Sequence, residues 1–213
     1  DAYGVTMRLK QSLFTLDEVA YAIGSGRARQ VYLDADSRIL PAEWDVRATS
    51  WKTTQAGQDG ASCLGCHSSG FDVSTRSFAE PGVGCEGCHG PGAAHVAKPA
   101  QGNIAGLNNM DKARQSMVCG QCHSAGRDVS GQHPHPVSFA PGDDLSKVFT
   151  DAKPTQPGKN QQYSEHIQSA HATNGVGCVD CHTAHNESGV KGQLAMSRAE
   201  LCQSCHEKQS SPD

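Results

Sequence analysis

The stretch Gly82-Val-Gly-Cys85-Glu-Gly-Cys88-His89-Gly-Pro-Gly92 decides how this chain folds. Its centre is a pair of cysteines, separated by two residues, with histidine directly after the second. Because only 11 of the 213 residues are histidine, its recurrence after cysteine pairs is not a result of composition. The pattern occurs five times and uses all ten cysteines: Cys63 and Cys66 with His67, Cys85 and Cys88 with His89, Cys119 and Cys122 with His123, Cys178 and Cys181 with His182, and Cys202 and Cys205 with His206.

This pattern is the attachment signature of c-type haem. The two thiols add across the two vinyl groups at one edge of the porphyrin, and a tight turn places both sulfurs along that edge. The histidine that follows is carried over the ring face, where its imidazole binds the iron as proximal ligand. Its other ring nitrogen usually donates a hydrogen bond that fixes the ring. The sequence therefore predicts five covalent haem c groups, each with one iron.

Two other kinds of site use paired cysteines. The 18 residues between Cys66 and Cys85, and the 20 between Cys181 and Cys202, fit the spacing of a zinc ribbon. A secreted protein also uses cysteines as a disulfide framework. Neither alternative explains a histidine after every pair, so covalent haem is the favoured interpretation.

Apolar side chains are scarce in this chain. Leu, Ile, Val and Phe together supply 33 of the 213 residues, and Gly and Pro supply as many. Such a composition is too poor in apolar groups to build an ordinary core for this length. If five porphyrins fill the interior instead, we expect a mainly irregular and α-helical multihaem cytochrome c fold wrapped around them.

Composition also limits the partners and the location. The formal net charge of −4 argues against a nucleic-acid-binding protein, which would carry a basic excess. No apolar run approaches the roughly 20 residues of a membrane-spanning helix, so no transmembrane segment is expected. Haem c is attached outside the cytoplasmic membrane, and the chain begins at Asp1 without a leader pattern. We therefore expect a mature, extracytoplasmic protein of the periplasm or cell surface.

Six further histidines are candidates for the distal iron ligands: His95, His133, His135, His166, His171 and His185. Five irons need five such ligands for complete bis-histidine coordination, so one histidine is spare. Methionine as the distal ligand would raise the potential. We expect all haems, or all but one, to be bis-histidine and low in potential.

Two of these histidines follow a motif closely. His185 comes three residues after His182, which is too short a connection to reach the other face of the same haem. We therefore expect His185 to bind the iron of a neighbouring haem and to tie two cofactors together. His95 comes six residues after His89, beyond a Gly-Pro-Gly turn, and the same argument applies to it less strongly.

The other four lie between the third and fourth motifs. Segment 160–172 is predicted to form a short helix, in which five residues at ~100° each place His166 and His171 about 140° apart, so that they serve different irons. His133 and His135 each precede a proline, which favours an extended backbone. We expect only one of that pair to bind iron.

Residues 1–62 contain no motif and are predicted to form a haem-free packing segment. Thr15-Leu-Asp-Glu18 is a capping-box pattern that starts a short helix, and Gly24 could end that helix. The segments Val31-Tyr-Leu33 and Arg38-Ile-Leu40 flank a polar turn and predict a β-hairpin. A small N-terminal helix plus hairpin is therefore expected.

Residues 63–213 are predicted to form a pentahaem region that contains an internal repeat. Cys63-Leu-Gly-Cys-His-Ser-Ser-Gly-Phe-Asp-Val-Ser74 matches Cys119-Gly-Gln-Cys-His-Ser-Ala-Gly-Arg-Asp-Val-Ser130. Gly82-Val-Gly-Cys85 likewise matches Gly175-Val-Gly-Cys178. These matches predict a repeated dihaem unit, over 63–118 and 119–185, followed by the fifth motif at 202–206.

The motifs resemble those of multihaem c-type cytochromes related to the tetrahaem cytochrome c-554. The string from Gly82 to Gly92 is the most specific part of the resemblance, which covers most of residues 12–206. It implies electron carriers and reductases of respiratory chains, and it favours His95, His171 and His185 as distal ligands. The chain departs from the family in lacking a further motif near its N-terminus. In the tetrahaem relative, the haem equivalent to that of Cys63 lacks a sixth ligand, which implies a possible open iron here.

Electron transfer through a chain of closely spaced haems is therefore the expected function, and the protein is expected to be a carrier rather than an enzyme. The partners would be other redox proteins, or identical subunits that stack into an extracellular cytochrome filament. The alternative is a small reductase or oxidase of nitrogen or sulfur species at the haem of Cys63, where catalysis would need a vacant iron position and acid–base groups.

The scarcity of apolar side chains predicts dependence on the cofactor. We expect the chain without haem to be largely unfolded, because its side chains alone cannot bury enough apolar surface to offset the conformational entropy of folding. Far-ultraviolet circular dichroism and thermal unfolding of the haem-free protein would check this. A compact haem-free protein that unfolds cooperatively would contradict the prediction.

Overall fold

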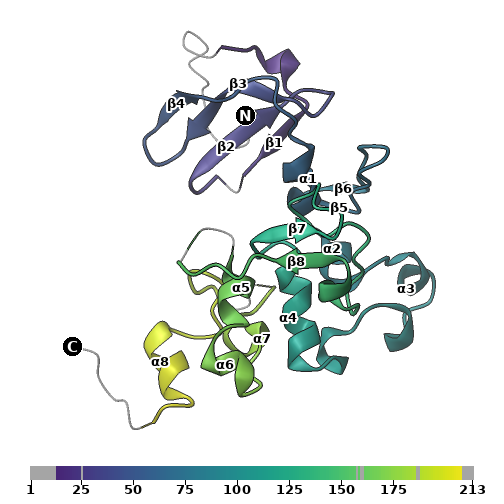
Figure 1. The fold of residues 1–213 in the computed structure, drawn as a ribbon, viewed down its shortest axis with the longest axis vertical. Coiled ribbons are helices and arrows are strands. Elements are labelled where there is room, and N and C mark those ends of the chain that lie inside the picture. The colour runs from purple at the N-terminus through teal and green to yellow at the C-terminus, as the bar shows by residue number, and fades with distance from the viewer. Residues whose placement is uncertain (1–12, 25, 157, 159–160, 186–187, 208–213) are drawn as a thin grey trace. The chain divides into compact units, whose positions relative to one another are not determined.

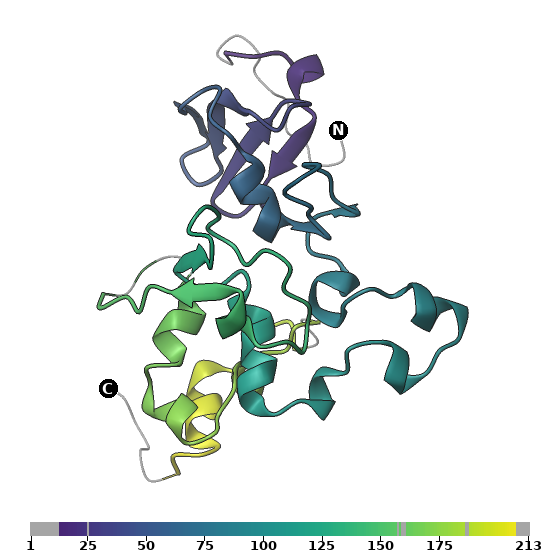
Figure 2. The ribbon, with the colours of Figure 1, turned by 45° about the vertical axis from the view of Figure 1, so that its right-hand side comes forward.

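The computed structural model describes residues 13–24, 26–156, 158, 161–185 and 188–207. The chain divides into two compact units, Asp1–Gly84 and Cys85–Asp213, whose elements are drawn in Figures 1 and 2. This division differs from the predicted boundary between residues 62 and 63. The first motif lies in the same unit as the N-terminal segment, and the other four motifs lie in the second unit.

The first unit is built on a four-stranded antiparallel sheet in chain order (Figure 1). Leu33 pairs with Ile39 across the turn of the predicted hairpin, which therefore forms as the centre of a larger sheet. The first four residues of the strand at 39–45 alternate between half-buried and buried side chains, as expected where one face covers a core. The strands are β1 (Tyr21–Ile23), β2 (Arg29–Leu33), β3 (Ile39–Asp45) and β4 (Ser50–Thr53).

Aromatic side chains supply most of the core against this sheet. Phe14, Leu40 and Ala42 are buried together, and Tyr32 and Trp51 pack against them. The Phe14 ring lies 5.4 Å from that of Tyr32 and meets Trp51 edge-on at 5.6 Å between centroids. Such pairs stabilise a small core beyond the area that they bury. The core of this unit thus consists of the protein's own side chains.

The predicted N-terminal helix is wrong in extent. The capping box is present, since the Thr15 backbone N–H and Oγ1 both donate to Glu18 Oε2, at 2.6 and 2.8 Å. It caps only a single 3₁₀ turn, Leu16–Glu18, because Val19 is already extended. Residues 21–23 form strand β1 against β2 instead of continuing the helix. Pairing with a neighbouring strand outweighs the local helix signal here.

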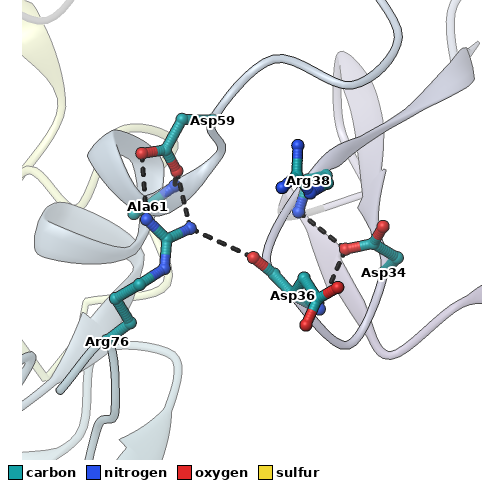
Figure 3. A network of polar contacts seen from close by, with 6 residues as sticks. All are labelled: Asp34, Asp36, Arg38, Asp59, Ala61 and Arg76. Carbon is teal, nitrogen blue, oxygen red and sulfur yellow. Dashed lines mark hydrogen bonds and ion pairs between the residues drawn. The ribbon is translucent and has the colours of Figure 1, made fainter.

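An arginine links the hairpin turn to the first motif's helix, α1 (Ala61–His67), in Figure 3. Arg76 forms a two-pronged ion pair with Asp59, at 3.0 and 2.8 Å, and also donates to the carbonyl of Asp36 in the turn. Arg76 lies in the loop between two short paired strands, β5 (Ser68–Ser69) and β6 (Glu80–Pro81). The loop after the first motif is thus fastened to the sheet of its own unit.

The second unit consists of short helices, one short strand pair and connecting turns (Figure 2). Leu145, Phe149 and Tyr163 form its buried cluster. Strands β7 (Gly126–Asp128) and β8 (Phe149–Asp151) pair antiparallel, and 3₁₀ turns lie at 101–103, 107–109 and 145–147. The helices are α2 (Cys85–His89), α3 (Ala93–Ala97), α4 (Lys112–Gly120), α5 (Gln162–His166), α6 (Ala170–Thr173), α7 (Cys178–Cys181) and α8 (Arg198–Gln203).

The single helix predicted over 160–172 is two helices, α5 and α6; Asn160 lies outside the described residues. Ser169 has an extended backbone and its side chain accepts a hydrogen bond from the N–H of Ala172, so it starts a new helix. The angular argument that separated His166 from His171 on one helix therefore does not apply. Because of the break at Ser169, His171 lies on a different helix from His166.

The two copies of the repeated string have the same local structure. Ser68 and Ser124, directly after the motif histidines, each bond the carbonyl four residues earlier. Asp72 accepts from the N–H and hydroxyl of Ser74, and Asp128 accepts from the same groups of Ser130. The similarity of sequence thus extends to the same hydrogen bonds.

No helix in the described ranges is long and apolar enough to cross a membrane.

Replacement of Gly60 tests how the sheet supports the first motif. A methyl group at Gly60 would lie 2.5 Å from a methyl carbon of Leu33, which is fully buried, and 2.7 Å from the Ser37 carbonyl. We expect Gly60→Ala to lower the free energy of unfolding by about 1–3 kcal/mol through overpacking. Denaturant unfolding followed by the fluorescence of the two tryptophans of the sheet would measure this. Gly102→Ala meets no atom within 4 Å and is the matched control; equal effects of both changes would contradict the prediction.

Candidate haem-binding sites

Each of the five motifs forms about one helical turn. Helices α1 and α2 run from before or at the first cysteine to the histidine. In the other three, the histidine N–H donates to the carbonyl of the first cysteine: His123 to Cys119, His182 to Cys178 and His206 to Cys202, at 2.9 to 3.0 Å. A turn of this kind brings side chains three positions apart onto one side. Both thiols of a motif can therefore meet one edge of a porphyrin.

Three motif histidines are fixed through Nδ1. His89 Nδ1 donates to the Ala105 carbonyl at 2.8 Å, and His182 Nδ1 donates to the Gly192 carbonyl at 3.0 Å. His123 Nδ1 bonds Gln162 Oε1 at 3.0 Å. Such a bond is the usual outer partner of a metal-binding imidazole, and it leaves Nε2 to face the metal. The donor set of these motifs thus fits haem iron.

The ring of His185 lies opposite that of His89. Their centroids are 6.4 Å apart and the ring planes differ by 18°. An imidazole nitrogen binds a first-row metal at about 2 Å, so two rings on opposite sides of one iron have centroids roughly 6 Å apart. The spacing of His89 and His185 matches that arrangement.

A second histidine pair has the same spacing. The centroids of His171 and His206 are 6.1 Å apart, with ring planes at 75°. His171 lies on α6, at the start of which Ser169 breaks the predicted helix, and His206 is the last residue of the fifth motif. Both pairs join a motif histidine to a histidine from a distant part of the chain.

His95 is held in place by an asparagine and a backbone carbonyl. Its Nδ1 lies 3.1 Å from the Ala100 carbonyl and 3.0 Å from Asn103 Oδ1. The Asn103 amide also donates to the carbonyls of Ala94 and Lys98, at 3.1 and 2.6 Å. This network orients the imidazole in the same way as the carbonyls do at the motif histidines.

His133 and His135 lie in a loop organised by Asp128. The carboxylate of Asp128 accepts from the N–H groups of Gln132 and His133, at 2.9 and 2.8 Å, and from Ser130. The Ser130 hydroxyl and these N–H groups lower the pKa of Asp128 to about 2. The two imidazoles are 5.6 Å apart, with His135 buried, and burial lowers the pKa of His135.

The remaining candidates have no such ring pair. His166, at the end of α5, lies close enough to Cys178 of the fourth motif to influence its titration. Within the described ranges, no second imidazole faces His67, His95, His123, His166 or His182 at the spacing of the two pairs. The His67 side chain is exposed.

Hydrogen bonds join the second, third and fourth motifs in chain order. Gln121, inside the third motif, donates to the carbonyl of Gly87, inside the second, at 2.8 Å. Ser116, on the helix of the third motif, accepts from the N–H of Cys178 in the fourth at 3.2 Å, and the neighbouring thiol of Cys119 lowers the pKa of Cys178 to about 5. Burial raises the pKa of Cys181, and nearby groups, including Cys202 and Cys205 of the fifth motif, raise it further.

The alternatives based on cysteine alone find no counterpart. All ten cysteines are among the described residues, and no disulfide joins any of them. Across the ranges that the structure describes, no three His, Cys, Asp or Glu side chains gather closely enough to hold one metal ion, as a zinc ribbon would require.

Several supporting residues could not be found from the sequence. Gln162, Asn103 and the carbonyls of Ala105 and Gly192 bond the histidines from loops and helices whose positions no motif specifies.

Two family models match parts of the chain. Residues 40–90 match the family described as cytochrome c554 and c-prime, and residues 171–211 match the doubled CXXCH motif. These segments contain the first two and the last two motifs. The predicted resemblance to multihaem c-type cytochromes of the c-554 group is confirmed, and the matches support covalent haem c. No curated protein matches the chain.

Two solved structures resemble the fold. The outer cell wall cytochrome OcwA is 23% identical, with a TM-score of 0.68 over 92% of this chain and 57% of that one. An undecaheme cytochrome from the S-layer of Carboxydothermus ferrireducens is 22% identical, with a TM-score of 0.58 over 92% of this chain and 36% of that one. This chain therefore spans little more than half of the first protein and about a third of the second.

The network around His95 can be tested through Asn103. Asn103→Ala removes one partner of the imidazole and the two bonds to the carbonyls of Ala94 and Lys98. Since each such bond contributes about 0.5–1.5 kcal/mol, we expect faster amide exchange at Val96 and Lys98, measured by hydrogen–deuterium exchange. Asn109→Ala, at an exposed position without such bonds, is the control. Unchanged protection in Asn103→Ala would contradict the prediction.

Proposed function

We propose that the chain carries five covalent haem c groups and passes electrons between them, as a carrier rather than an enzyme. The observation that carries this proposal is the contact between successive motifs of the second unit, through Gln121 and Gly87 and then Ser116 and Cys178. When haem c is bound, its iron alternates between the ferric and ferrous states and so holds or releases one electron. Motifs in direct contact would hold neighbouring porphyrins close enough for such exchange.

We assign the ligands on the spacing of the imidazoles. His89 with His185, and His171 with His206, would be the axial pairs of the second and fifth haems, on the measured centroid separations. His95, held by Asn103, one of His133 and His135, and His166 are the candidates for the remaining distal positions. Paired imidazole ligands favour low potentials.

The role of these residues is to fix each iron, so that little has to rearrange when it changes charge. The carbonyls of Ala105 and Gly192 and the amide of Gln162 hold the motif histidines against rotation. Two thioether bonds at each motif would prevent the haem from dissociating. These features support a carrier, whose cofactors exchange electrons without binding a substrate.

The location and partners follow from the chemistry of attachment. The two structural neighbours are cytochromes of an outer cell wall and of an S-layer. An extracytoplasmic location, in the periplasm or at the cell surface, is our proposal for this chain. Ten ionised propionates added to a net charge of −4 would give about −14, which favours basic redox partners. Identical subunits in a filament are the other arrangement that we propose.

The haem of Cys63 is where a second function would be located. His67 is exposed, and no imidazole in the described ranges faces it at the spacing of the axial pairs. An iron with one open position could reduce or oxidise small nitrogen or sulfur species. This candidate rests on the first haem alone and leaves the transfer path of the second unit unchanged.

Two measurements on the purified protein test the proposal. A pyridine haemochrome assay should give five haems per chain, and electron paramagnetic resonance of the oxidised protein should give low-spin ferric signals. A high-spin signal from one haem would favour the second function. A count below five would overturn the proposal of a five-haem carrier.

Substitution of His185 tests the first axial pair. We expect His185→Ala to convert one haem from low to high spin, because His89 would then be its only imidazole ligand. His185→Met should keep the haem low-spin and raise its potential, since methionine is the higher-potential ligand. Electron paramagnetic resonance and a redox titration would measure both effects. Thr183→Val is the control, and a low-spin spectrum in His185→Ala identical to that of the parent would rule out the pairing.

A further inference from the structure

Helices α4 and α7 contact each other directly, and each carries a haem motif. Ser116 on α4 accepts a hydrogen bond from the backbone N–H of Cys178, the first residue of α7, at 3.2 Å. One turn earlier, Lys112 Nζ lies 2.5 Å from Asp180 Oδ1 on α7. The two contacts cross from the helix of the third motif to that of the fourth.

Each side of this junction is braced by its own helix. The Ser116 hydroxyl donates to the Lys112 carbonyl at 2.8 Å, which leaves its lone pairs for the N–H of Cys178. The second carboxylate oxygen of Asp180 accepts from the N–H of Gly177 at 2.8 Å. A methyl group at Gly177 would lie 3.2 Å from both Cβ and the carbonyl oxygen of Lys112, so the lack of a side chain there permits the close approach. The junction is therefore tight and fixed at two points.

The junction brings two attachment cysteines near each other. Cys119 lies one turn beyond Ser116 on α4, and Ser116 accepts the backbone N–H of Cys178, the first residue of α7. With haem attached, the sulfurs of both residues would be thioethers at the edge of a porphyrin. Because Cys119 and Cys178 are each the first cysteine of a motif, the equivalent edges of two haems would approach each other at this junction.

We infer that Lys112, Ser116 and Asp180 are positioning residues that set the contact between the haem edges of the third and fourth motifs. The inference rests on the proposed five-haem function and deepens it, because it names the residues that fix the relative position of one neighbouring pair of haems. Lys112 and Asp180 are both more than one-third exposed, and exposed ion pairs contribute little to stability. Their removal should therefore alter the geometry of the haem pair more than the stability of the fold.

The test uses the full haem-loaded protein and the Soret circular dichroism, whose paired positive and negative bands report the relative placement of neighbouring haems. We expect Lys112→Ala and Ser116→Ala each to lose part of the amplitude of this couplet. The conservative variants Lys112→Arg and Ser116→Thr, which keep both contacts and the bond from Gly177 to Asp180, should keep it. Lys52→Ala breaks an ion pair of the same kind with Asp45 in the first unit and should leave the couplet unchanged.

The outcomes separate this inference from the function on which it rests. A parent protein with fewer than five haems would overturn the proposed function. Five haems in every variant, with an unchanged couplet in Lys112→Ala and Ser116→Ala, would overturn the positioning role alone. If those variants lose haem, as shown by mass spectrometry of the two motif peptides, the comparison passes to Lys112→Arg and Ser116→Thr. Failure of both to keep the parent couplet would also overturn it.

Discussion

The structure depends on one local constraint, the helical turn that joins two thiols and an imidazole within five residues. The hydrogen bond from the histidine N–H to the carbonyl of the first cysteine, as in Cys178–His182, closes that turn. It is made by the backbone alone, so it forms whatever residues occupy the two intervening positions. Larger elements are then not required around each motif, which explains why the second unit can consist of short helices and turns.

The features that could be predicted from the sequence are those that local chemistry specifies. The five motifs and the central hairpin depend on residues close together in the chain. Prediction failed where distant contacts decide, since the helix signal at Thr15 gave way to strand pairing at 21–23. The break at Ser169 and the supports from Asn103 and Gln162 also lay beyond prediction, because a cap or an amide partner gains its role only from its surroundings.

The two units differ in how they form a core from few apolar side chains. The first packs Phe14, Tyr32 and Trp51 on a sheet and so has a core of its own. In the second, the described residues include a small buried cluster around Tyr163. Much of its remaining sequence consists of histidines, turns and polar side chains that bond the histidines. Four of the five motifs therefore lie in the unit whose own side chains form the smaller core, and we expect that unit to depend more on porphyrin for folding. The first motif is attached to a conventional sheet.

The facing imidazoles of His89 and His185 link positions 96 residues apart. A chain exported and loaded with haem from its N-terminus would carry the second motif outside long before His185 emerged. The entropic cost of closing so long a loop would then be offset only late in folding. Contacts between residues far apart in the sequence also slow folding. Until that closure the iron above His89 would have a vacant face, so the order of secretion and the speed of folding determine how long a reactive centre is exposed.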